Sequence, residues 1–274
     1  MKVITWNVHG ANEKSPVWQY FSGLDADVAL LQEVIGIPQE IKNIYSVLSR
    51  VAIYKTGKPQ RFSTAVITKG TIVNEINLKS DYDWVERELD FFNGNLVGCS
   101  VQIPNQELLN IISVYSPAWP VDKIRLTGID VSQVKLQSNP DVWVTEILWA
   151  TLKKAVTKNS NWIVGGDFNS SETFDKEWQI RYGVKHGLQS SGNKEILDRM
   201  QNLGLTECLR RYNNGKIIPT FKHSSGEIAH QMDHIFVTDR LFLRINNCIA
   251  GDPITVFDKL SDHLPIIVDF KTIL

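Results

Sequence analysis

Polar side chains in this sequence occur within or at the ends of short apolar runs that have the composition of β-strands. Runs of about four to eight apolar and β-branched residues, bounded by Gly, Asn, Asp or Pro, are typical of strands. The polar residues that accompany these runs are Asn7, Glu33, Tyr115, Asp167, Asn169, Asp233, His234, Asp262 and His263. Where two sheets pack face to face, strand ends from distant parts of the chain meet at one rim. We therefore expect these side chains to converge on one site.

The side-chain types in this set favour chemistry on phosphate esters. Carboxylate and amide oxygens, without a thiolate, select hard cations such as Mg²⁺ or Mn²⁺ over zinc. Such ions neutralise the non-bridging oxygens of a phosphate and support the leaving oxygen. A histidine oriented by an aspartate supplies a base or a proton-sharing partner near neutral pH. Each residue alone would suit a turn that hydrogen-bonds the backbone, but their joint occurrence indicates phosphoester hydrolysis.

Strand candidates recur along the chain and outnumber helix candidates. Three-to-four spacing of apolar residues predicts helices over Ser15–Leu24, Val142–Lys158 and Lys194–Leu203. These helices fall between groups of strands, which predicts an α/β four-layer α/β/β/α sandwich: two mixed β-sheets packed face to face with outer helices. The strand candidates are Lys2–Trp6, Val28–Gln32, Ser63–Thr68, Gly98–Ile103, Leu109–Tyr115, Trp162–Gly165, Gln231–Val237 and Ile266–Phe270.

The chain shows no sign of a division into domains. Its hydrophobic content of 43% and charged content of 22% are those of an ordinary globular protein. Because no repeat, low-complexity tract or flexible linker interrupts the sequence, we expect one domain over residues 1–274. The segment Ser116–Asp141 is irregular and contains three prolines. Long connections inside a domain are usually functional or mobile, so we expect this segment to lie over one edge of the sandwich and to influence specificity.

Charge and cysteine content limit the other function classes. The formal net charge of −1 gives no argument for tight non-specific binding to nucleic acid, although a local basic strip remains compatible with it. The cysteines Cys99, Cys208 and Cys248 are far apart and form no CxxC pair. This spacing favours buried, reduced thiols over a zinc site or a disulfide framework. The sequence contains neither a signal peptide nor an apolar run long enough for a membrane span, so we expect a cytoplasmic protein.

Five short motifs together resemble a known superfamily. They are Thr5-Trp6-Asn7-Val8-His9-Gly10, Leu31-Gln32-Glu33-Val34, Gly166-Asp167-Phe168-Asn169, Gln231-Met232-Asp233-His234-Ile235-Phe236 and Ser261-Asp262-His263. In this order they resemble the motifs of the endonuclease/exonuclease/phosphatase superfamily. That group includes pancreatic deoxyribonuclease, exonuclease III, abasic-site endonucleases, sphingomyelinases, inositol-polyphosphate 5-phosphatases and deadenylases. The resemblance spans residues 3–270 and implies divalent-metal-dependent hydrolysis of phosphodiester bonds.

The resemblance implies a metal site and a site for the attacking water. Glu33 would be the principal ligand of Mg²⁺ or Mn²⁺, with Asn7 beside it and Asp262 contributing directly or through water. Asp167 would position or deprotonate the attacking water. Asn169 would hold a phosphate oxygen and orient the nucleophile.

The resemblance also implies two contacts to the scissile phosphate. His263 would contact the phosphate, with its ring fixed by Asp233. Members similar to exonuclease III carry a tyrosine where those similar to pancreatic deoxyribonuclease carry a histidine, and this chain has Tyr115 there. The phenol would donate to the phosphate or the leaving oxygen, which favours the exonuclease III side of the family. Tyrosine also ends many strands for packing reasons.

Other residues have a functional and a structural interpretation. His9 stands where abasic-site enzymes tend to have an acidic or amide residue, and it is either a phosphate contact or an ordinary loop histidine. Arg61 and Lys222 are candidate substrate contacts near aromatic residues that could stack bases, or they belong to solvated loops. The Arg-rich stretch of repair enzymes and the basic motifs of inositol phosphatases are both absent from the sequence.

Three functions are compatible with these observations. The first is a nuclease acting on DNA or RNA, which a groove flanked by Lys55, Lys58 and Arg61 would favour. The second is a phosphoesterase for a small phosphorylated metabolite or lipid head group, which a deep pocket closed by Ser116–Asp141 would favour. The third is a catalytically silent binding module, which the complete set of polar residues argues against. No docking motif in the sequence identifies a protein partner.

Overall fold

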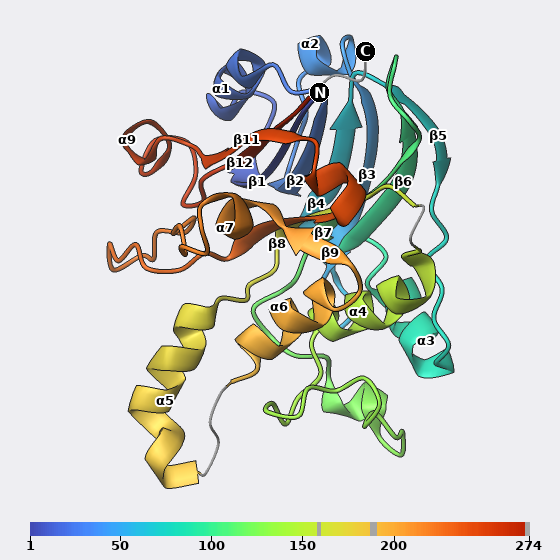
Figure 1. Ribbon diagram of the computed structural model, residues 1–274, viewed down its shortest axis with the longest axis vertical. Helices are drawn as coiled ribbons and strands as arrows, with labels where there is room; N and C mark the ends of the chain where they lie inside the picture. The colour runs from blue at the N-terminus through green and yellow to red at the C-terminus, as the bar shows by residue number, and fades with distance from the viewer. Residues whose placement is uncertain (158–159, 187–190, 272–274) are drawn as a thin grey trace.

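Two six-stranded β-sheets pack face to face in the computed structural model, which describes residues 1–157, 160–186 and 191–271 (Figure 1). Each sheet contains one parallel pair, β1–β2 or β7–β8, among antiparallel neighbours. The first sheet, in spatial order, is β11 (Ile245–Ala250), β12 (Ile266–Phe270), β1 (Lys2–Ala11), β2 (Val28–Val34), β4 (Pro59–Thr68) and β3 (Ser46–Ile53). The second is β5 (Thr71–Glu75), β6 (Leu96–Gln102), β7 (Leu109–Tyr115), β8 (Trp162–Asp167), β10 (Asp233–Thr238) and β9 (Leu205–Glu207).

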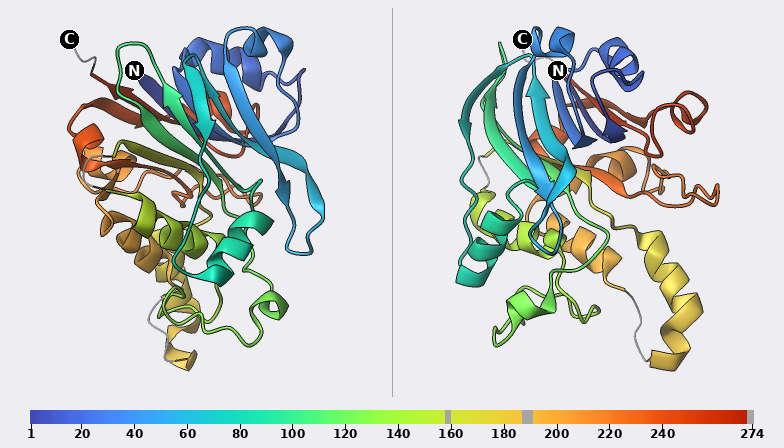
Figure 2. Two further views of the ribbon diagram at one scale, coloured as in Figure 1. Left: turned by 90° about the vertical axis from the view of Figure 1, so that its right-hand side faces the viewer. Right: turned by 180° about the vertical axis from the view of Figure 1, so that it is seen from behind.

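Helices cover the outer faces of both sheets. Figure 2 shows α1, in blue, and α4, in yellow-green, on opposite sides of the pair of sheets. The helices described are α1 (Val17–Leu24), α2 (Gln39–Lys42), α3 (Asp83–Phe91), the 3₁₀ helix η1 (Lys123–Leu126), α4 (Val144–Ala155), α5 (Glu172–His186), α6 (Asn193–Gln201), α7 (Cys208–Tyr212), α8 (Asp239–Phe242) and α9 (Pro253–Val256). Among the described residues, no helix is long and apolar enough to cross a membrane.

Alternate residues of the central strands point to different layers of the core. In β1, Val3 lies in the core between the sheets, whereas Ile4 and Trp6 pack with residues of α1. In β8, Ile163 lies between the sheets and Val164 packs with residues of α4 and α6. Because both faces of these strands are covered, their sequences are apolar almost throughout. These layers confirm the predicted four-layer sandwich.

The strands that the sequence pattern does not predict are the four sheet edges, β3, β5, β9 and β11. An edge strand has one neighbour and more exposed side chains, so it lacks the apolar run that identifies a central strand. Strand β5 contains no buried residue, and β9 has only three residues. By contrast, β7 and β12 have the predicted bounds.

Two other sequence expectations can be compared with the structure. The predicted helix Val142–Lys158 is α4, whose last residue is Ala155; Lys158 lies outside the described residues. The three cysteines are buried and free, as expected. Burial raises the pKa of the Cys99 thiol to about 12, so this thiol remains protonated and unreactive at neutral pH.

The segment 116–141 contains only one short helix, η1, and lies at the end of the molecule opposite the two termini (Figure 1). Arg199 of α6 donates to the carbonyl oxygens of Val134 and Lys135 at 2.6 and 3.1 Å. The segment is therefore anchored to α6.

Candidate active site

The register of the second sheet brings three predicted site residues together. The parallel pairing of β7 with β8 places Tyr115 beside Asp167, since both residues end their strands. The antiparallel pairing of β8 with β10 places Asp233 on the other side of Asp167. Gly166 permits this close approach, because a Cβ at this position would lie 1.9 Å from the carbonyl oxygen of Val114. The convergence expected from the sequence is thus a consequence of strand pairing.

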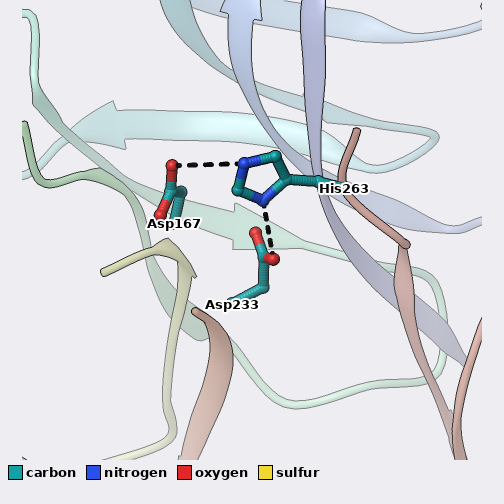
Figure 3. Close-up of side chains that lie close together, drawn as sticks. All are labelled: Asp167, Asp233 and His263. Atoms are coloured by element: carbon teal, nitrogen blue, oxygen red, sulfur yellow. Dashed lines mark hydrogen bonds and ion pairs between the residues drawn. The ribbon is translucent and has the colours of Figure 1, made fainter. Parts of the chain in front are cut away.

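His263 lies between two carboxylates (Figure 3). Its Nδ1 is 2.8 Å from Asp233 Oδ2, and its Nε2 is 4.0 Å from Asp167 Oδ2. The Asp233 oxygen also accepts a hydrogen bond of 2.7 Å from Thr220 Oγ1. All of these side chains are buried. Asp233 therefore fixes the orientation of the imidazole and directs Nε2 towards Asp167.

Burial and mutual charge shift the protonation of this group. Burial raises the pKa of the Asp167 carboxyl and Asp233 raises it further, although the neighbouring His263 acts in the opposite direction. Burial lowers the pKa of the His263 imidazole, but the charges of Asp233 and Asp167 outweigh burial and hold it well above its usual value. The site thus contains an imidazole that is cationic near neutral pH and a carboxyl group that readily accepts a proton.

Amide groups fix the Asp167 carboxylate from two directions. The backbone N–H of Asn169 donates to Asp167 Oδ1 at 2.9 Å, and Asn7 Nδ2 donates to Oδ2 at 3.1 Å. Asn169 Nδ2 donates to the Ser116 carbonyl oxygen at 2.6 Å and contacts Asp167 Oδ2 at 3.3 Å. The amide nitrogen of Asn169 is therefore occupied by the protein, and its Oδ1 accepts no hydrogen bond from the described residues.

Three site residues adopt the left-handed backbone region. The φ angles of His9, Glu33 and Asn169 are 48°, 57° and 47°. Histidine and asparagine tolerate this region better than glutamate does. Glu33 lies where the register of β2 shifts, before Val34, against both β1 and β4. Backbone strain of this kind persists where the surrounding structure enforces it, and it is concentrated at functional sites.

Tyr115 is buried beside the same carboxylates. Its ring packs edge-on against Phe62, with the centroids 5.2 Å apart. Burial raises the pKa of the phenol well above 10, and the charges of Glu33 and Asp167 raise it further. The hydroxyl therefore remains protonated and can donate a hydrogen bond.

The comparisons with known proteins agree with this geometry. The sequence profile of the endonuclease/exonuclease/phosphatase family matches residues 4–263. The chain belongs to this family. Its members are hydrolases that act on phosphoesters, and they generally depend on divalent metal ions. No curated protein matches the chain.

Solved structures of this family share the fold of the chain at low sequence identity. An AP endonuclease from Archaeoglobus fulgidus is 20% identical, with 99% of both chains covered and a TM-score of 0.69. The 3′ phosphatase NExo from Neisseria, bound to a product DNA hairpin, is 16% identical, with 99% of both chains covered and a TM-score of 0.67. The Xenopus laevis APE2 catalytic domain is 17% identical, with 99% of this chain and 92% of that chain covered and a TM-score of 0.68.

The family's divalent metal fits the residues around Asn7. The amide Nδ2 of Asn7 lies 3.4 Å from Glu33 Oε1 and 3.1 Å from Asp167 Oδ2, so two carboxylates share one neutral neighbour. The carboxylate oxygen Oδ1 of Asp233 is buried without a hydrogen-bond partner in the described chain. Several acidic groups thus face few cations, which is the environment of a hard-cation site.

Asp262 and His9 contact each other at the rim of the site. His9 Nδ1 lies 3.0 Å from Asp262 Oδ1, and the His9 side chain is 63% exposed. In the described chain the ion-pair contact of Asp262 is therefore with His9 rather than with a residue of the Asn7–Glu33 group. The backbone N–H of His9 donates to Asn7 Oδ1 at 3.0 Å, which connects the rim to the metal candidates.

The two basic substrate candidates lie at the same rim. Arg61 is exposed on β4, and its Nη2 would be 3.8 Å from a Cβ placed on Gly10. Lys222 forms an ion pair with Asp258, and its backbone N–H donates to the carbonyl oxygen of Asp262 at 2.8 Å. Lys222 also lines a depression of about 620 Å³, the Asp262 depression, together with His9, His223, Asp258, Lys259 and Asp262.

Sequence reasoning missed residues that support the site indirectly. Ser261 donates to the backbone oxygen of Asn7 at 2.7 Å and accepts from the backbone N–H of His263 at 3.0 Å. Trp6 Nε1 donates to the His263 carbonyl oxygen at 2.8 Å. Both residues belong to motifs noted in the sequence, and that membership was the available signal. Thr220, which holds Asp233, lies outside those motifs and carries no such signal.

Proposed function

We propose that this protein is a nuclease that hydrolyses phosphodiester bonds of DNA or RNA with Mg²⁺ or Mn²⁺. The observation that carries the proposal is the buried Asp167–His263–Asp233 group, which shares Asn7 with the metal candidate Glu33. Few other reactions need a cationic imidazole, a basic carboxylate and a hard-cation site together. Because the site combines residues from β1 to the segment before β12, we propose one catalytic domain over residues 1–274.

Water attack is assigned to the residues around Asp167. Asp167 accepts a proton from the attacking water as the new oxygen–phosphorus bond forms, and the bond to the leaving oxygen breaks. Asn169 orients this water through its side-chain Oδ1, which accepts a hydrogen bond from the water. The raised pKa of Asp167 suits this role, because a general base works best when its pKa lies near the working pH.

His263 and Tyr115 stabilise the negative charge that develops on the phosphate during the reaction. The cationic imidazole, oriented by Asp233, and the phenol donate hydrogen bonds to the phosphate or the leaving oxygen. Donors held in place before the reaction stabilise such charge at little reorganisation cost. A divalent ion held by Glu33 and Asn7, with Asp262 nearby, would neutralise non-bridging oxygens.

Nucleic acid is the preferred substrate class for two reasons. The structural relatives include AP endonucleases and a 3′ phosphatase with a bound DNA hairpin. In addition, the Asp262 depression beside the site contains Lys222 and Lys259 among two histidines, Asp258 and Asp262, and the two ammonium groups can contact phosphates that flank the scissile one.

A small phosphorylated molecule is the second candidate substrate. A cavity of about 280 Å³, the Asn169 cavity, adjoins the site and is lined by Ala118, Leu136, Asn139, Trp143, Asn169 and Phe174, among others. Three of these residues belong to Ser116–Asp141, so part of this segment does border a pocket. Such a pocket suits a compact substrate as well as one unit of a polymer.

A substrate panel distinguishes these functions. It contains plasmid DNA, an abasic-site duplex, single-stranded RNA, an inositol polyphosphate and bis-p-nitrophenyl phosphate, each with Mg²⁺ or Mn²⁺. We expect cleavage of a nucleic acid that is lost with EDTA and in His263→Ala. Turnover of the inositol phosphate or the generic diester alone would favour the small-molecule function. Inactivity on every substrate would favour a binding module.

A further inference from the structure

The Asn169 cavity opens directly beside the catalytic residues. Asn169 and Ser170 form part of its lining, so a group bound there is attached within a few bonds of a phosphate at Asp167. Its volume of about 280 Å³ exceeds the roughly 150 Å³ that admits a benzene ring. It is smaller than most complete small-molecule sites. The cavity therefore suits one ring system of a larger substrate.

Two carboxylates, the buried Glu146 and the partly exposed Glu195, hold the wall that segment 116–141 contributes. Glu146 of α4 accepts the backbone N–H groups of Leu136 and Trp143 at 3.1 and 2.8 Å. Glu195 of α6 accepts the backbone and hydroxyl groups of Ser138 at 3.2 and 2.6 Å. These bonds fix an irregular segment against two helices. The cavity is thus preorganised, which reduces the entropy lost when a ligand binds.

The part of the lining that residues 174 and 191–193 contribute is also held by hydrogen bonds and packing. Asp175 accepts the backbone N–H groups of Ser191 and Asn193 at 3.0 and 3.1 Å. Phe174 packs against the buried imidazole of His230, with the ring centroids 4.1 Å apart. The Phe174 ring is therefore held in position at the edge of the cavity.

The lining is uncharged and aromatic. It contains no lysine, arginine or histidine, and its one acidic residue is Glu146. Burial raises the pKa of the Glu146 carboxyl to about 8, so this group is mostly neutral at pH 7. The rings of Trp143 and Phe174 lie on the walls, and the buried Trp143 Nε1 has no hydrogen-bond partner in the described chain. A second phosphate finds no cation here, whereas a flat, uncharged ring finds the aromatic residues Trp143 and Phe174 in the lining.

We propose that the Asn169 cavity binds one unpaired nucleobase of the nucleotide at the scissile phosphate, an inference that rests on the proposed nuclease function. Aromatic walls bind bases by stacking, which every base permits. The side-chain nitrogens of Asn139 and Asn193 already donate to the protein, so few groups remain to distinguish one base from another. The substrate is therefore single-stranded or carries a flipped-out nucleotide, and base preference is weak.

Ala118 offers a way to fill the cavity with little risk to the fold, because it is exposed and lines the cavity. The variants are Ala118→Trp and the matched control Ala118→Ser. The substrates are a thymidine oligonucleotide and the same oligonucleotide with tetrahydrofuran abasic residues at all internal positions. We expect wild type to prefer the base-bearing substrate in kcat/KM by about tenfold or more, the scale of one base–aromatic stack. Ala118→Trp should abolish this preference by raising KM for that substrate alone.

Two results would overturn the inference: equal kcat/KM on both oligonucleotides in wild type, or an equal loss on both in Ala118→Trp. Thymidine 5′-(p-nitrophenyl phosphate) distinguishes the source of the base, since rates on it equal to those on the oligonucleotide would indicate free nucleotides as the substrate. Both sources support a base in the cavity.

Binding measurements keep this inference distinguishable from the proposed function. Fluorescence anisotropy of both oligonucleotides with His263→Ala, alone and combined with Ala118→Trp, requires no turnover. One outcome is base-dependent binding that Ala118→Trp weakens about tenfold, without hydrolysis by the wild type. It would refute the proposed nuclease function and support base binding in the Asn169 cavity. Hydrolysis whose rate Ala118→Trp does not change would refute base binding in the Asn169 cavity and support the proposed nuclease function.

Discussion

The two hollows beside the proposed catalytic residues, the Asn169 cavity and the Asp262 depression, differ in size and in the charged residues that line them. The Asn169 cavity, of about 280 Å³, has aromatic and amide walls without a basic residue. The Asp262 depression, of about 620 Å³, contains two lysines, two histidines and two aspartates. A nucleotide chain has the same asymmetry, because its bases are uncharged rings and its backbone is anionic. The difference therefore suggests how a strand lies across the site, with a base on one side and phosphates on the other.

The largest expected effect comes from replacing Asp167. Asp167→Asn removes the proposed general base, so we expect kcat to fall by about a hundredfold or more. The backbone N–H of Asn169 can still donate to the remaining side-chain oxygen, in the place of Oδ1, and the fold should survive. Initial rates and circular dichroism measure the two quantities. Near-wild-type activity in this variant would contradict the proposed role of Asp167 as the general base.

The dependence of kcat/KM on pH tests the proposed role of His263. The pKa of His263 is raised by the charges of Asp233 and Asp167, so the cationic form persists above neutral pH and is lost at alkaline pH. Asp233→Asn removes one of these charges and lowers that pKa. We expect the alkaline limb of kcat/KM to move to lower pH by about one to three units. An unmoved limb would show that another group controls it.

The lysines of the Asp262 depression predict that kcat/KM depends on the salt concentration. Replacing Lys222 and Lys259 together by Ala should reduce the slope of log kcat/KM against log salt by about two on an oligonucleotide, roughly one for each lysine that binds a phosphate. Bis-p-nitrophenyl phosphate should be turned over as before. Lys42→Ala, on α2, is the matched control. A slope equal to that of the control would show that the phosphates of the substrate do not contact the Asp262 depression.

The last predicted effect concerns the stability of the fold around Glu146, in the lining of the Asn169 cavity. The folded-state pKa of Glu146, about 8, lies above its unfolded value of 4.5, so the folded protein binds an extra proton between these values. The free energy of unfolding should therefore fall as pH rises from about 4.5 to 8, by on the order of a few kcal/mol from this residue. Glu146→Gln should abolish that component in urea titrations across this pH range. An unchanged dependence on pH would assign it to other groups.

The sequence predicts some parts of this molecule better than others for physical reasons. Strands β7 and β12 have the predicted bounds because they are central and almost entirely buried, whereas edge strands such as β5 expose most of their side chains. The proximity of Tyr115, Asp167 and Asp233 was predictable because all three lie at the ends of strands that pair with one another. The Asn169 cavity was not, because bonds such as that between Ser138 and Glu195 connect positions 57 residues apart without a local pattern.

The left-handed backbone at Glu33 has a consequence for how this sequence changes over generations. Glycine or asparagine suits a φ of 57° better than glutamate does. Drift limited by stability alone would therefore replace this residue readily, while the buried strands around it would change slowly. As the proposed principal metal ligand, Glu33 would persist only while the reaction itself is under selection. A duplicated copy of the gene freed from that selection would lose this glutamate early, before its fold decayed.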